Sequence, residues 1–311
     1  MKKVQVLLSS YNGEKYIKEQ IESIFNQIGV EINCLIRDDG STDGTIEIIK
    51  KMQVKYANLK LIVGKNIGWR QSFKDLVFLS SDKMDYYSFA DQDDIWLPNK
   101  VERAIQIIEQ EENYDQPILY YSDAYVVDED IKIIGHKINL EPPLYKESSI
   151  SICYGQGCTM IFNPKARDFF VSYKTKENIS HEQWLSTLCI YFGRVIHDPY
   201  LSIFYRQHDN NIFGGKKISK ISLIKKWLKG KSHYKGVMCY NDLYDGFFDN
   251  LSDKEKNKIC DLKNMENSMI SRLKVFLNPN IKRYTILGTI FFKLNLLFKN
   301  YMANIVEFGS W

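Results

Sequence analysis

The sequence predicts an α/β protein with a mostly parallel, doubly wound sheet flanked by helices and a helical C-terminal extension. Short apolar runs of strand length alternate with segments of helical periodicity through the first half of the chain. Polar clusters follow three of these runs, where the strands of a parallel sheet would end. With 311 residues, of which 44% are hydrophobic, the chain is long enough for one large domain and a smaller appendage.

The first part of the chain predicts strands and helices in alternation. The strands are the apolar runs 4–8, 32–36, 59–63 and 86–90. The helices carry apolar residues at three- and four-residue spacing, at Ile17, Ile21 and Ile24, at Ile46, Ile49 and Met52, at Phe73, Leu76 and Val77, and at Val101, Ile105 and Ile108. A mostly parallel sheet is the economical arrangement of such βαβ units.

After Asp94 the pattern becomes mixed. Further strands are predicted at 118–121, 126–127 and 158–162, and a loop is predicted around Glu141-Pro142-Pro143. This part therefore does not continue the regular βαβ alternation.

The last third of the chain contains two apolar segments. Residues 216–235 carry eight lysines and no acids, with apolar residues at helical spacing. This pattern suits an interfacial helix on anionic lipid, and an ordinary surface helix docked on the main domain has it equally. The apolar stretch 284–298 is interrupted by Lys293 and Asn295. It falls short of the roughly 20 residues needed to span a bilayer, so we expect a core or interfacial helix.

Composition excludes several classes of protein. The net charge of +4 comes from 42 basic and 38 acidic residues, which is too even a balance to make nucleic acid the expected partner. The six cysteines form no CxxC pair, and Cys34 lies inside an apolar run, so we expect buried free thiols and no structural zinc site. The N-terminus enters a predicted strand without the apolar stretch of a signal peptide, which indicates a cytoplasmic protein.

The segment Ala90–Trp96 carries the strongest chemical pattern. Asp91 and Asp93 stand two residues apart directly after an apolar strand, so both side chains can project past the strand end. Their oxygens are suitable ligands for Mg²⁺ or Mn²⁺ carrying a diphosphate. Taken alone, the motif is also typical of a solvated turn or a helix N-cap, with Asp94 as the candidate cap.

Two further polar clusters, Ser9–Asn12 and Arg37–Ser41, follow the first two predicted strands. In doubly wound sheets, ligands bind beyond the carboxyl ends of the strands. We therefore expect all three clusters to converge on one crevice.

The segments Leu8–Glu14, Ile36–Thr45 and Ala90–Trp96 closely resemble, in order and spacing, the family 2 glycosyltransferases of GT-A fold. Within that family, Asp91–Trp96 and Tyr205–His208 are most similar to bacterial rhamnosyltransferases of cell-wall and capsular polysaccharide assembly. The resemblance covers roughly residues 1–215.

This resemblance implies an inverting, metal-dependent transferase that moves L-rhamnose from dTDP-rhamnose onto a lipid-linked glycan. It implies a catalytic domain over 1–215, with a nucleotide-sugar-binding half at about 1–95 and an acceptor-side half at 96–215. Residues 216–311 would form a helical, basic and amphipathic region. Peripheral contact with the inner face of the cell membrane would follow, and no nucleic acid would bind.

Donor-binding residues are expected in the first two polar clusters. Tyr11 offers a stacking face for a base, and Asp39 can accept the imide N3 hydrogen of uracil or thymine. Supporting contacts are expected from Ser9, Asn12 and Asp38.

The resemblance also implies two basic donor contacts. The loop 66–70 faces the donor in similar enzymes, so Arg70 is a candidate phosphate or ribose contact, with a solvated arginine as the alternative. Arg206 would place a second cation near the diphosphate.

A metal site is expected around Asp93, which is the first metal ligand in this interpretation. By resemblance, His208 completes the site, and Asp91 lies nearer the ribose and binds the metal through water. The ion, Mn²⁺ or Mg²⁺, would offset charge on the departing nucleoside diphosphate.

Inverting transfer needs a general base that takes the proton of the acceptor hydroxyl, and Glu182 is the candidate. Related enzymes usually carry an aspartate at this position, so the chain departs from the family by one methylene. His181 and Glu177 stay open as alternatives, and the segment 180–184 could also simply begin a helix. The glycine loop 154–158 is expected on the acceptor side, where its glycines could equally serve a tight turn.

Two other functions stay open. Tyr11 and Asp39 would not readily separate thymine from uracil, so a hexosyl- or N-acetylhexosaminyltransferase that uses a UDP-sugar is the first alternative. The second is a non-catalytic assembly module on a lipid surface, which the basic segment 216–235 suggests.

Overall fold

The computed structural model describes residues 1–139, 141–142, 145–150, 152–208, 239–265, 267–283 and 285–298. The chain forms two compact units. Unit 1 comprises residues 1–142, 154–172 and 180–214, and unit 2 comprises residues 143–153, 173–179 and 215–311. The predicted amphipathic helix at 216–235 lies outside the described residues.

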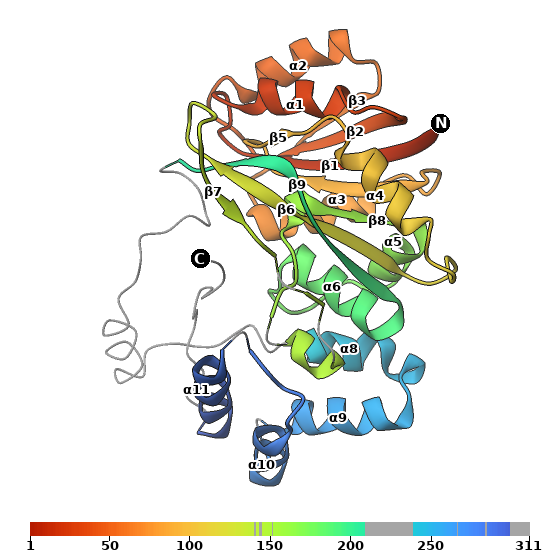
Figure 1. Cartoon of the computed structure of the whole chain (residues 1–311), viewed down its shortest axis with the longest axis vertical. Helices are drawn as coiled ribbons and strands as arrows, with labels where there is room; N and C mark the ends of the chain where they lie inside the picture. The colour runs from red at the N-terminus through yellow and green to blue at the C-terminus, as the bar shows by residue number, and fades with distance from the viewer. Residues whose placement is uncertain are drawn as a thin grey trace. The chain divides into compact units, whose positions relative to one another are not determined.

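Unit 1 is built on a sheet of nine strands among the described residues (Figure 1). Four of them run parallel in the order β3-β2-β1-β4. These strands are β1 (Lys2–Ser10), β2 (Val30–Asp38), β3 (Leu59–Val63) and β4 (Tyr86–Ala90). They are joined by the helices α1 (Ile17–Phe25), α2 (Thr45–Lys55) and α3 (Trp69–Leu79). The predicted βαβ pattern of this part of the chain is confirmed.

The remaining strands make the sheet mixed. β8 (Met160–Phe162) runs antiparallel to β4 and to β6 (Ile118–Val127), and β9 (Arg194–Arg206) runs parallel to β6. Two short strands complete the sheet, β5 (Ile95–Trp96) against β9 and β7 (Ile133–Lys137) against β6. The helices of this part are α4 (Lys100–Ile108), α5 (Pro164–Val171) and α6 (His181–Phe192), with the short 3₁₀ helix η2 (Gly157–Thr159). The 3₁₀ helix η1 (Lys146–Ile150) belongs to unit 2.

One strand boundary was predicted wrongly. The runs 118–121 and 126–127 belong to a single strand, β6. The polar pair Ser122 and Asp123 interrupts the apolar pattern, but both residues are buried in the strand. Their side chains have partners on β9, since Ser122 bonds to the Ser202 hydroxyl and Asp123 bonds to His197. Polar residues with partners on a neighbouring strand can occupy a central strand, and a hydropathy pattern alone does not reveal them.

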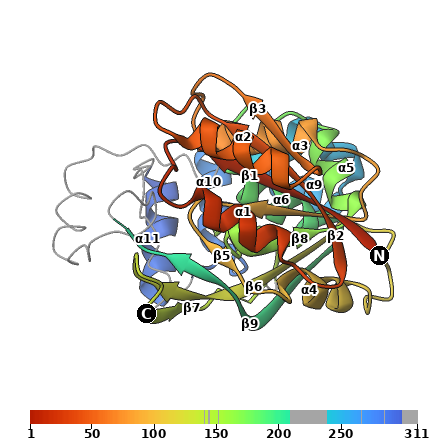
Figure 2. The ribbon, with the colours of Figure 1, turned by 90° about the horizontal axis from the view of Figure 1, so that it is seen from above.

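Helices cover both faces of this sheet. The side chains of Val4, Val6 and Leu8 on β1 share a core with α1, α2 and α4. On the opposite face, α3, α5 and α6 pack against one another (Figure 2). Strands buried on both sides explain the continuous apolar runs in the sequence.

The described part of unit 2 is helical, as the sequence predicts. It contains α8 (Cys239–Phe247), η3 (Phe248–Asn250), α9 (Asp253–Asn264), α10 (Met269–Leu277) and α11 (Ile286–Leu297), each α-helix packing on the next. Ser252 and Glu255 form a capping box at the start of α9. Among the described residues, every helix is too short or too polar to cross a membrane. All six cysteines are free, four of them buried and two half-buried.

His197 on β9 links three parts of unit 1. Its Nε2 lies 2.9 Å from Asp123 Oδ1 on β6, and its Nδ1 lies 2.8 Å from Glu141 Oε1. The imidazole also stacks on the Tyr121 ring, with 5.2 Å between ring centres. Burial lowers the pKa of His197, but the hydrogen bonds and charges of Asp123 and Glu141 outweigh burial and raise the pKa above 6.5.

This histidine should make the stability of unit 1 depend on pH. A raised pKa means that the folded chain binds the proton more tightly than the unfolded chain. The stabilisation is therefore complete below pH 6.5 and is lost as the pH rises through the folded-state pKa. Urea unfolding should show a larger advantage of the wild type over His197→Phe at low pH than at high pH. His136→Phe, at an exposed position on β7, is the control and should show no such trend; an advantage of the same size at every pH would contradict the ion pairs.

Candidate active site

The order of the strands reverses between β1 and β4. β2 and β3 extend the sheet on one side of β1, and β4 lies on the other side. Such a switch point leaves a crevice at the carboxyl ends of the two strands, because the following loops diverge to opposite faces. The segments after β1 and β4 are the polar clusters that begin near Ser9 and at Asp91.

Two hydrogen bonds between Tyr11 and Gln92 join these two clusters. The Tyr11 N–H donates to Gln92 Oε1 at 2.8 Å, and Gln92 Nε2 donates to the Tyr11 carbonyl oxygen at 3.1 Å. The backbone of Tyr11 is thus held while its side chain stays 46% exposed. An exposed ring on a fixed backbone suits a stacking contact with a base.

The second polar cluster is tied to the first through Asp38. This fully buried carboxylate accepts hydrogen bonds from the Ser10 hydroxyl at 2.8 Å and from the N–H and hydroxyl of Ser41 at 2.7 and 2.6 Å. Asn12 adopts a left-handed conformation with φ 48°, and its Oδ1 accepts from the Thr42 N–H at 2.9 Å. Both residues shape the loops, and direct donor contacts from them stay a prediction.

Ser9 lies at the end of β1, where its hydroxyl and that of Ser72 on α3 are 2.6 Å apart. This bond fixes α3 against β1. A donor contact from Ser9 likewise stays a prediction.

Asp39 is buried and anchors the loop before α3. Its Oδ1 accepts from Arg37 Nη1 at 2.5 Å and from the Ile67 N–H at 2.9 Å, and its Oδ2 accepts from the Gly68 N–H at 2.8 Å. Oδ2 keeps one lone pair, so a further donor such as an imide N–H can still bind. The buried Arg37 was not singled out by the sequence, although its place beside two aspartates was a usable signal.

Arg70 lies at the start of α3 and is exposed. Its guanidinium carbon is 4.7 Å from the centre of the Trp69 ring. An exposed arginine on an aromatic platform can reach a ligand, and its role as a phosphate or ribose contact stays a prediction.

Asp93 and His208 meet at the end of the sheet, although 115 residues separate them in the chain. Asp93 Oδ2 lies 2.8 Å from His208 Nε2. The His208 ring stacks on Tyr16, with 5.0 Å between ring centres, and this contact fixes its orientation. The structure therefore brings together the two residues predicted to hold a metal.

Asp94 is a residue of this site that the sequence had offered only as a candidate helix cap. It does not cap a helix, because α4 begins at Lys100 with Asn99 in the cap position. Instead, the side chains of Asp94, Asp91 and Cys158 offer ligand atoms within 4.8 Å of one another. Asp94 is buried, and its Oδ2 has no hydrogen-bond partner. Nothing in the sequence indicated that Cys158 would join this cluster.

Crowding changes the acidity of these carboxyl groups. Burial, followed by the charges of Asp93 and Glu182, raises the pKa of Asp91 to about 7. Burial, followed by the charges of Asp93 and Asp91, holds the pKa of Asp94 well above its ordinary value. Because like charges repel strongly where water is excluded, a cation placed among these groups would relieve the repulsion.

Lys100 is fully buried close to this acidic cluster. Its Nζ donates to the Ser88 hydroxyl at 3.3 Å and lies 3.8 Å from the centre of the Trp96 ring. Burial lowers the pKa of Lys100 to about 7, although Cys158 and Asp94 oppose the shift. No pattern in the sequence singles out this lysine.

Arg206 is buried at the end of β9. Its Nε donates to the Asp93 carbonyl oxygen at 2.9 Å, and its Nη1 and Nη2 donate to the Glu129 carbonyl oxygen at 2.7 Å and to Glu19 Oε2 at 2.5 Å. This arginine therefore fixes the backbone of the metal-binding candidate Asp93. Its predicted contact with the diphosphate stays a prediction.

Glu182 lies in the first turn of α6, whose N-cap is Ser180. His181 Nδ1 is 3.0 Å from Glu182 Oε2. Burial raises the pKa of Glu182, but the charge and hydrogen bond of His181 outweigh burial, so the pKa is lowered overall. The charge of Glu182 in turn contributes to the raised pKa of Asp91, and a shared site for the two carboxyl groups stays a prediction.

The two alternatives to Glu182 have packing or hydrogen-bond partners of their own, and both stay alternatives. The His181 ring is buried, stacked on Phe73 at 4.1 Å and in edge contact with Phe89 at 4.4 Å. Glu177 belongs to unit 2, where its Oε1 accepts from Asn241 Nδ2 at 2.9 Å.

The glycine loop 154–158 packs closely on the residues around it. Gly155 has φ 80°, and a Cβ at this position would lie 2.6 Å from Cγ of Tyr121. A Cβ on Gly157 would lie 2.9 Å from His181 Nε2. Close approach therefore accounts for both glycines.

The fold and this arrangement define a GT-A glycosyltransferase. Residues 5–167, more than half of the chain, match the family described as glycosyl transferase family 2. The chain belongs to this family. The predicted family and fold are thereby confirmed, and the non-catalytic alternative is set aside.

Two curated relatives show the range of activities among similar proteins. The dTDP-rhamnosyl transferase RfbG of Shigella flexneri is 27% identical over 248 residues, which cover 71% of this chain and 81% of the relative. WfaP of Escherichia coli, a UDP-Glc:alpha-D-GlcNAc-diphosphoundecaprenol beta-1,3-glucosyltransferase, is 22% identical over 241 residues, which cover 77% and 91%. The chain spans less than half of the length of three further curated relatives that it matches.

A solved structure supports the fold over almost the whole chain. Residues 1–349 of TarS from S. aureus, in complex with UDP-GlcNAc, align with a TM-score of 0.58. The identity is 15%, and the alignment covers 97% of this chain and 82% of that chain. At this identity the likeness concerns the fold.

Replacing the carboxylate that faces His208 should weaken metal binding. We expect Asp93→Ala to lower the affinity for Mn²⁺ at least about tenfold, because it removes a charged oxygen ligand from the crowded cluster. Calorimetric titration with Mn²⁺ measures the change. Asp168→Ala, at an exposed aspartate on α5, is the control. Unchanged affinity in Asp93→Ala would place the metal elsewhere.

Proposed function

We propose that this protein is an inverting, metal-dependent glycosyltransferase that moves L-rhamnose from dTDP-rhamnose onto a lipid-linked glycan. The observation that carries the proposal is the 2.8 Å contact of Asp93 with His208, together with the cluster in which Asp91, Asp94 and Cys158 offer ligand atoms within 4.8 Å of one another. Similarity to a dTDP-rhamnosyl transferase supports the donor, and similarity to WfaP supports an acceptor attached to a lipid diphosphate. We assign donor binding to residues 1–95 and the acceptor side to residues 96–215.

The cellular setting belongs to the same proposal. An enzyme that uses lipid-linked acceptors in bacterial capsule or cell-wall polysaccharide synthesis works at the cytoplasmic face of the membrane. We therefore propose a peripheral location there, with residues 216–311 as the region next to the lipid.

Asp93 and His208, with Asp91 beside them, would hold Mn²⁺ or Mg²⁺. The Asp93 carboxylate and the His208 imidazole, 2.8 Å apart, are ligands that Mn²⁺ accepts. The carboxyl groups of Asp91 and Asp94, whose oxygens lie within 4.8 Å of each other, also fit a divalent cation. When bound, such an ion neutralises negative charge on the departing nucleoside diphosphate.

Glu182 would act as the general base. Its carboxylate takes the proton of the acceptor hydroxyl as that oxygen forms a bond to the anomeric carbon. The bond from the anomeric carbon to the diphosphate breaks, and its electron pair leaves with the nucleoside diphosphate. The lowered pKa keeps Glu182 ionised at neutral pH, as a base requires.

Other residues orient the reactants. The exposed Tyr11 ring stacks on the pyrimidine, and Asp39 Oδ2 accepts the imide hydrogen. Arg206 and Gln92 hold the backbone of the donor site in place through their hydrogen bonds to Asp93 and Tyr11.

A UDP-sugar is the second candidate donor. TarS was solved with UDP-GlcNAc, and WfaP is named for a UDP-Glc donor. Neither Tyr11 nor Asp39 contacts the position where thymine and uracil differ, since stacking and imide recognition are common to both bases.

Donor preference decides between the two candidates. We expect the purified protein, in the presence of Mn²⁺, to bind dTDP-rhamnose more tightly than UDP-glucose, UDP-galactose or UDP-N-acetylglucosamine, and to lose this binding without the metal. Calorimetry with all four donors measures the order. Tightest binding of a UDP-sugar would retain the mechanism and overturn the rhamnosyl assignment.

The general base is tested by a substitution that removes charge and retains shape. Glu182→Gln should lower the transfer rate by about 10² to 10⁴, because general-base catalysis is lost, and should leave donor affinity nearly unchanged. Glu182→Asp, the residue usual in the family, should retain part of the activity. Glu47→Gln on α2 serves as the control. A wild-type rate in Glu182→Gln would rule out this base.

A further inference from the structure

We propose that the α10–α11 surface of unit 2 docks on a membrane that contains anionic lipid. This surface is formed by the apolar side chains that these two neighbouring helices expose. They are Met269, Ile270, Leu273, Leu277, Ile286, Leu287, Ile290 and Phe298. The inference deepens the proposed function and rests on it for the membrane setting. It assigns a surface within the described residues, whereas the sequence had suggested the segment 216–235 and a core or interfacial helix at 284–298.

The exposed apolar residues lie along one side of each helix. On α10, Ile270, Leu273 and Leu277 follow one another at three- and four-residue spacing, and Ile270 and Leu277 are 69% and 71% exposed. On α11, Ile286 is 81% exposed and Leu287 is 68% exposed. This spacing produces a continuous apolar stripe on a helix.

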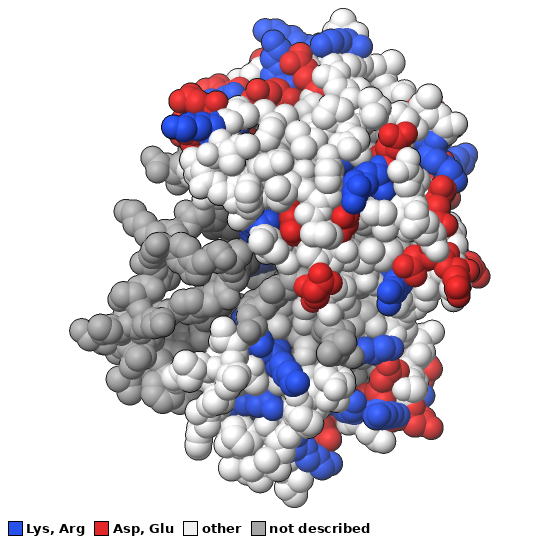
Figure 3. All heavy atoms as spheres, in the orientation of Figure 1, with Lys and Arg blue, Asp and Glu red and all other residues white. Residues whose placement is uncertain are grey.

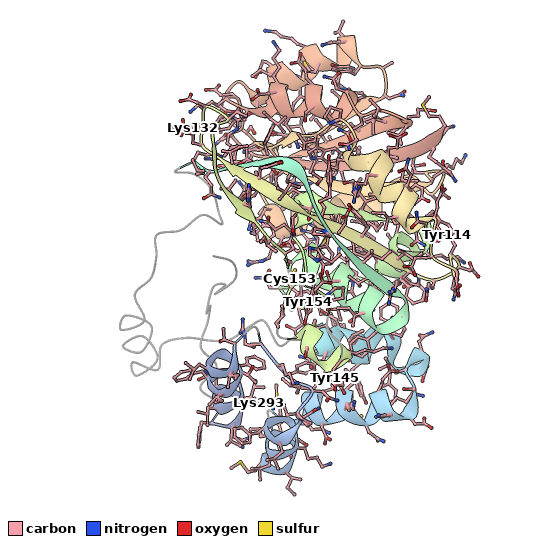
Figure 4. The ribbon with its side chains drawn as sticks, in the orientation of Figure 1. Tyr114, Lys132, Tyr145, Cys153, Tyr154 and Lys293 are labelled. Carbon is pink, nitrogen blue, oxygen red and sulfur yellow. The ribbon has the colours of Figure 1, made fainter. Side chains whose placement is uncertain are left out.

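The opposite sides of the same helices are already used for packing. Val275 is buried on α10, and Phe292 and Leu296 are buried on α11. Lys293 lies between the two helices (Figure 4), where its Nζ donates to the Asn278 carbonyl oxygen at 2.5 Å. The exposed stripes are therefore additional apolar surface, not the core of the helix pair.

These stripes concentrate the exposed apolar residues of unit 2. In the described part of this unit, Phe291 on α11 and Tyr145 are the other large apolar side chains that are exposed. Contiguous apolar surface on a water-exposed protein marks an interaction site more often than scattered residues do.

The charged residues of this surface indicate which kind of partner it binds. Residues 267–298 carry Arg272, Lys274, Lys282, Arg283 and Lys293 and no aspartate or glutamate. Lys274 and Lys282 are exposed, and Lys274 Nζ also lies 3.1 Å from Asp261 Oδ1 on α9. Figure 3 shows the corresponding part of the surface mainly in white, with blue atoms among the white ones.

An anionic membrane suits both properties at once. Its acyl region receives apolar side chains, and its headgroups attract lysine and arginine. A second copy of the chain would suit them less well, because two such surfaces would bring cations together without acids from residues 267–298. Neither helix has to span the bilayer, and neither is long or apolar enough to do so.

Vesicle binding by the full chain tests the proposal. The probes are vesicles of phosphatidylcholine alone and of phosphatidylcholine mixed with phosphatidylglycerol. We expect cosedimentation with the mixed vesicles, weaker binding to phosphatidylcholine and a loss of binding at high salt. Ile270→Gln combined with Leu287→Gln should abolish most of the binding. Lys274→Gln combined with Lys282→Gln should weaken it by about fivefold for each cation.

Val54→Gln is the matched control, because Val54 is an apolar residue of α2 in unit 1 that is 91% exposed. Circular dichroism confirms that each variant is folded. Donor binding in solution is measured on the same variants and should not change, so failure of the membrane proposal is distinguishable from failure of the proposed function.

Three results would overturn the proposal. One is equal binding of the wild type and both double variants to the mixed vesicles, and another is no binding by the wild type. The third is a wild-type dimer in light scattering that Ile270→Gln with Leu287→Gln converts to a monomer, which would assign the surface to a second copy.

Discussion

Repulsion among acidic side chains at the carboxyl end of β4 is the constraint on which the rest of the site depends. Asp91, Asp93, Asp94 and Glu182 are close enough for their charges to shift one another's acidity or that of a neighbour. Carboxylates cannot remain ionised together in a water-poor site unless a cation compensates them. Charge that would destabilise an ordinary core is thus concentrated where a divalent ion and a diphosphate would bind.

The surrounding structure holds these groups and compensates their charge only in part, because imidazoles face Asp93 at 2.8 Å and Glu182 at 3.0 Å. Arg206 donates a hydrogen bond to the backbone of Asp93, not to its carboxylate. The Gln92 side chain is hydrogen-bonded to the backbone of Tyr11. The carboxyl groups of Asp91 and Asp94 each have an oxygen within 4.8 Å of the other and of the Cys158 sulfur. Neither forms a direct ion pair among the described residues. Strong support of the backbone with little compensation of charge is what a preorganised cation site requires.

The donor and the acceptor of the proposed reaction require different surfaces of the protein. The donor is a compact, charged molecule, and unit 1 offers it fixed loops and buried carboxylates. A lipid-linked acceptor is confined to a membrane, and the α10–α11 surface of unit 2 offers exposed apolar and basic side chains. Contiguous exposed apolar surface is typical of an interaction site, and the proposed membrane-bound acceptor would account for it.

The sequence by itself determined the βαβ half of the fold through local periodicity, and the family through short motifs that resemble it. The roles of Asp93, His208 and Glu182, which that resemblance implies, stay predictions. Only the tertiary structure decided that β6 is continuous through Ser122 and Asp123 and that Asp94 is buried among acids and does not cap a helix. The physical reason is the same in these cases. The burial and partners of such side chains come from strands and loops far away in the chain, such as β9 and the loop containing Cys158, and no local pattern records those contacts.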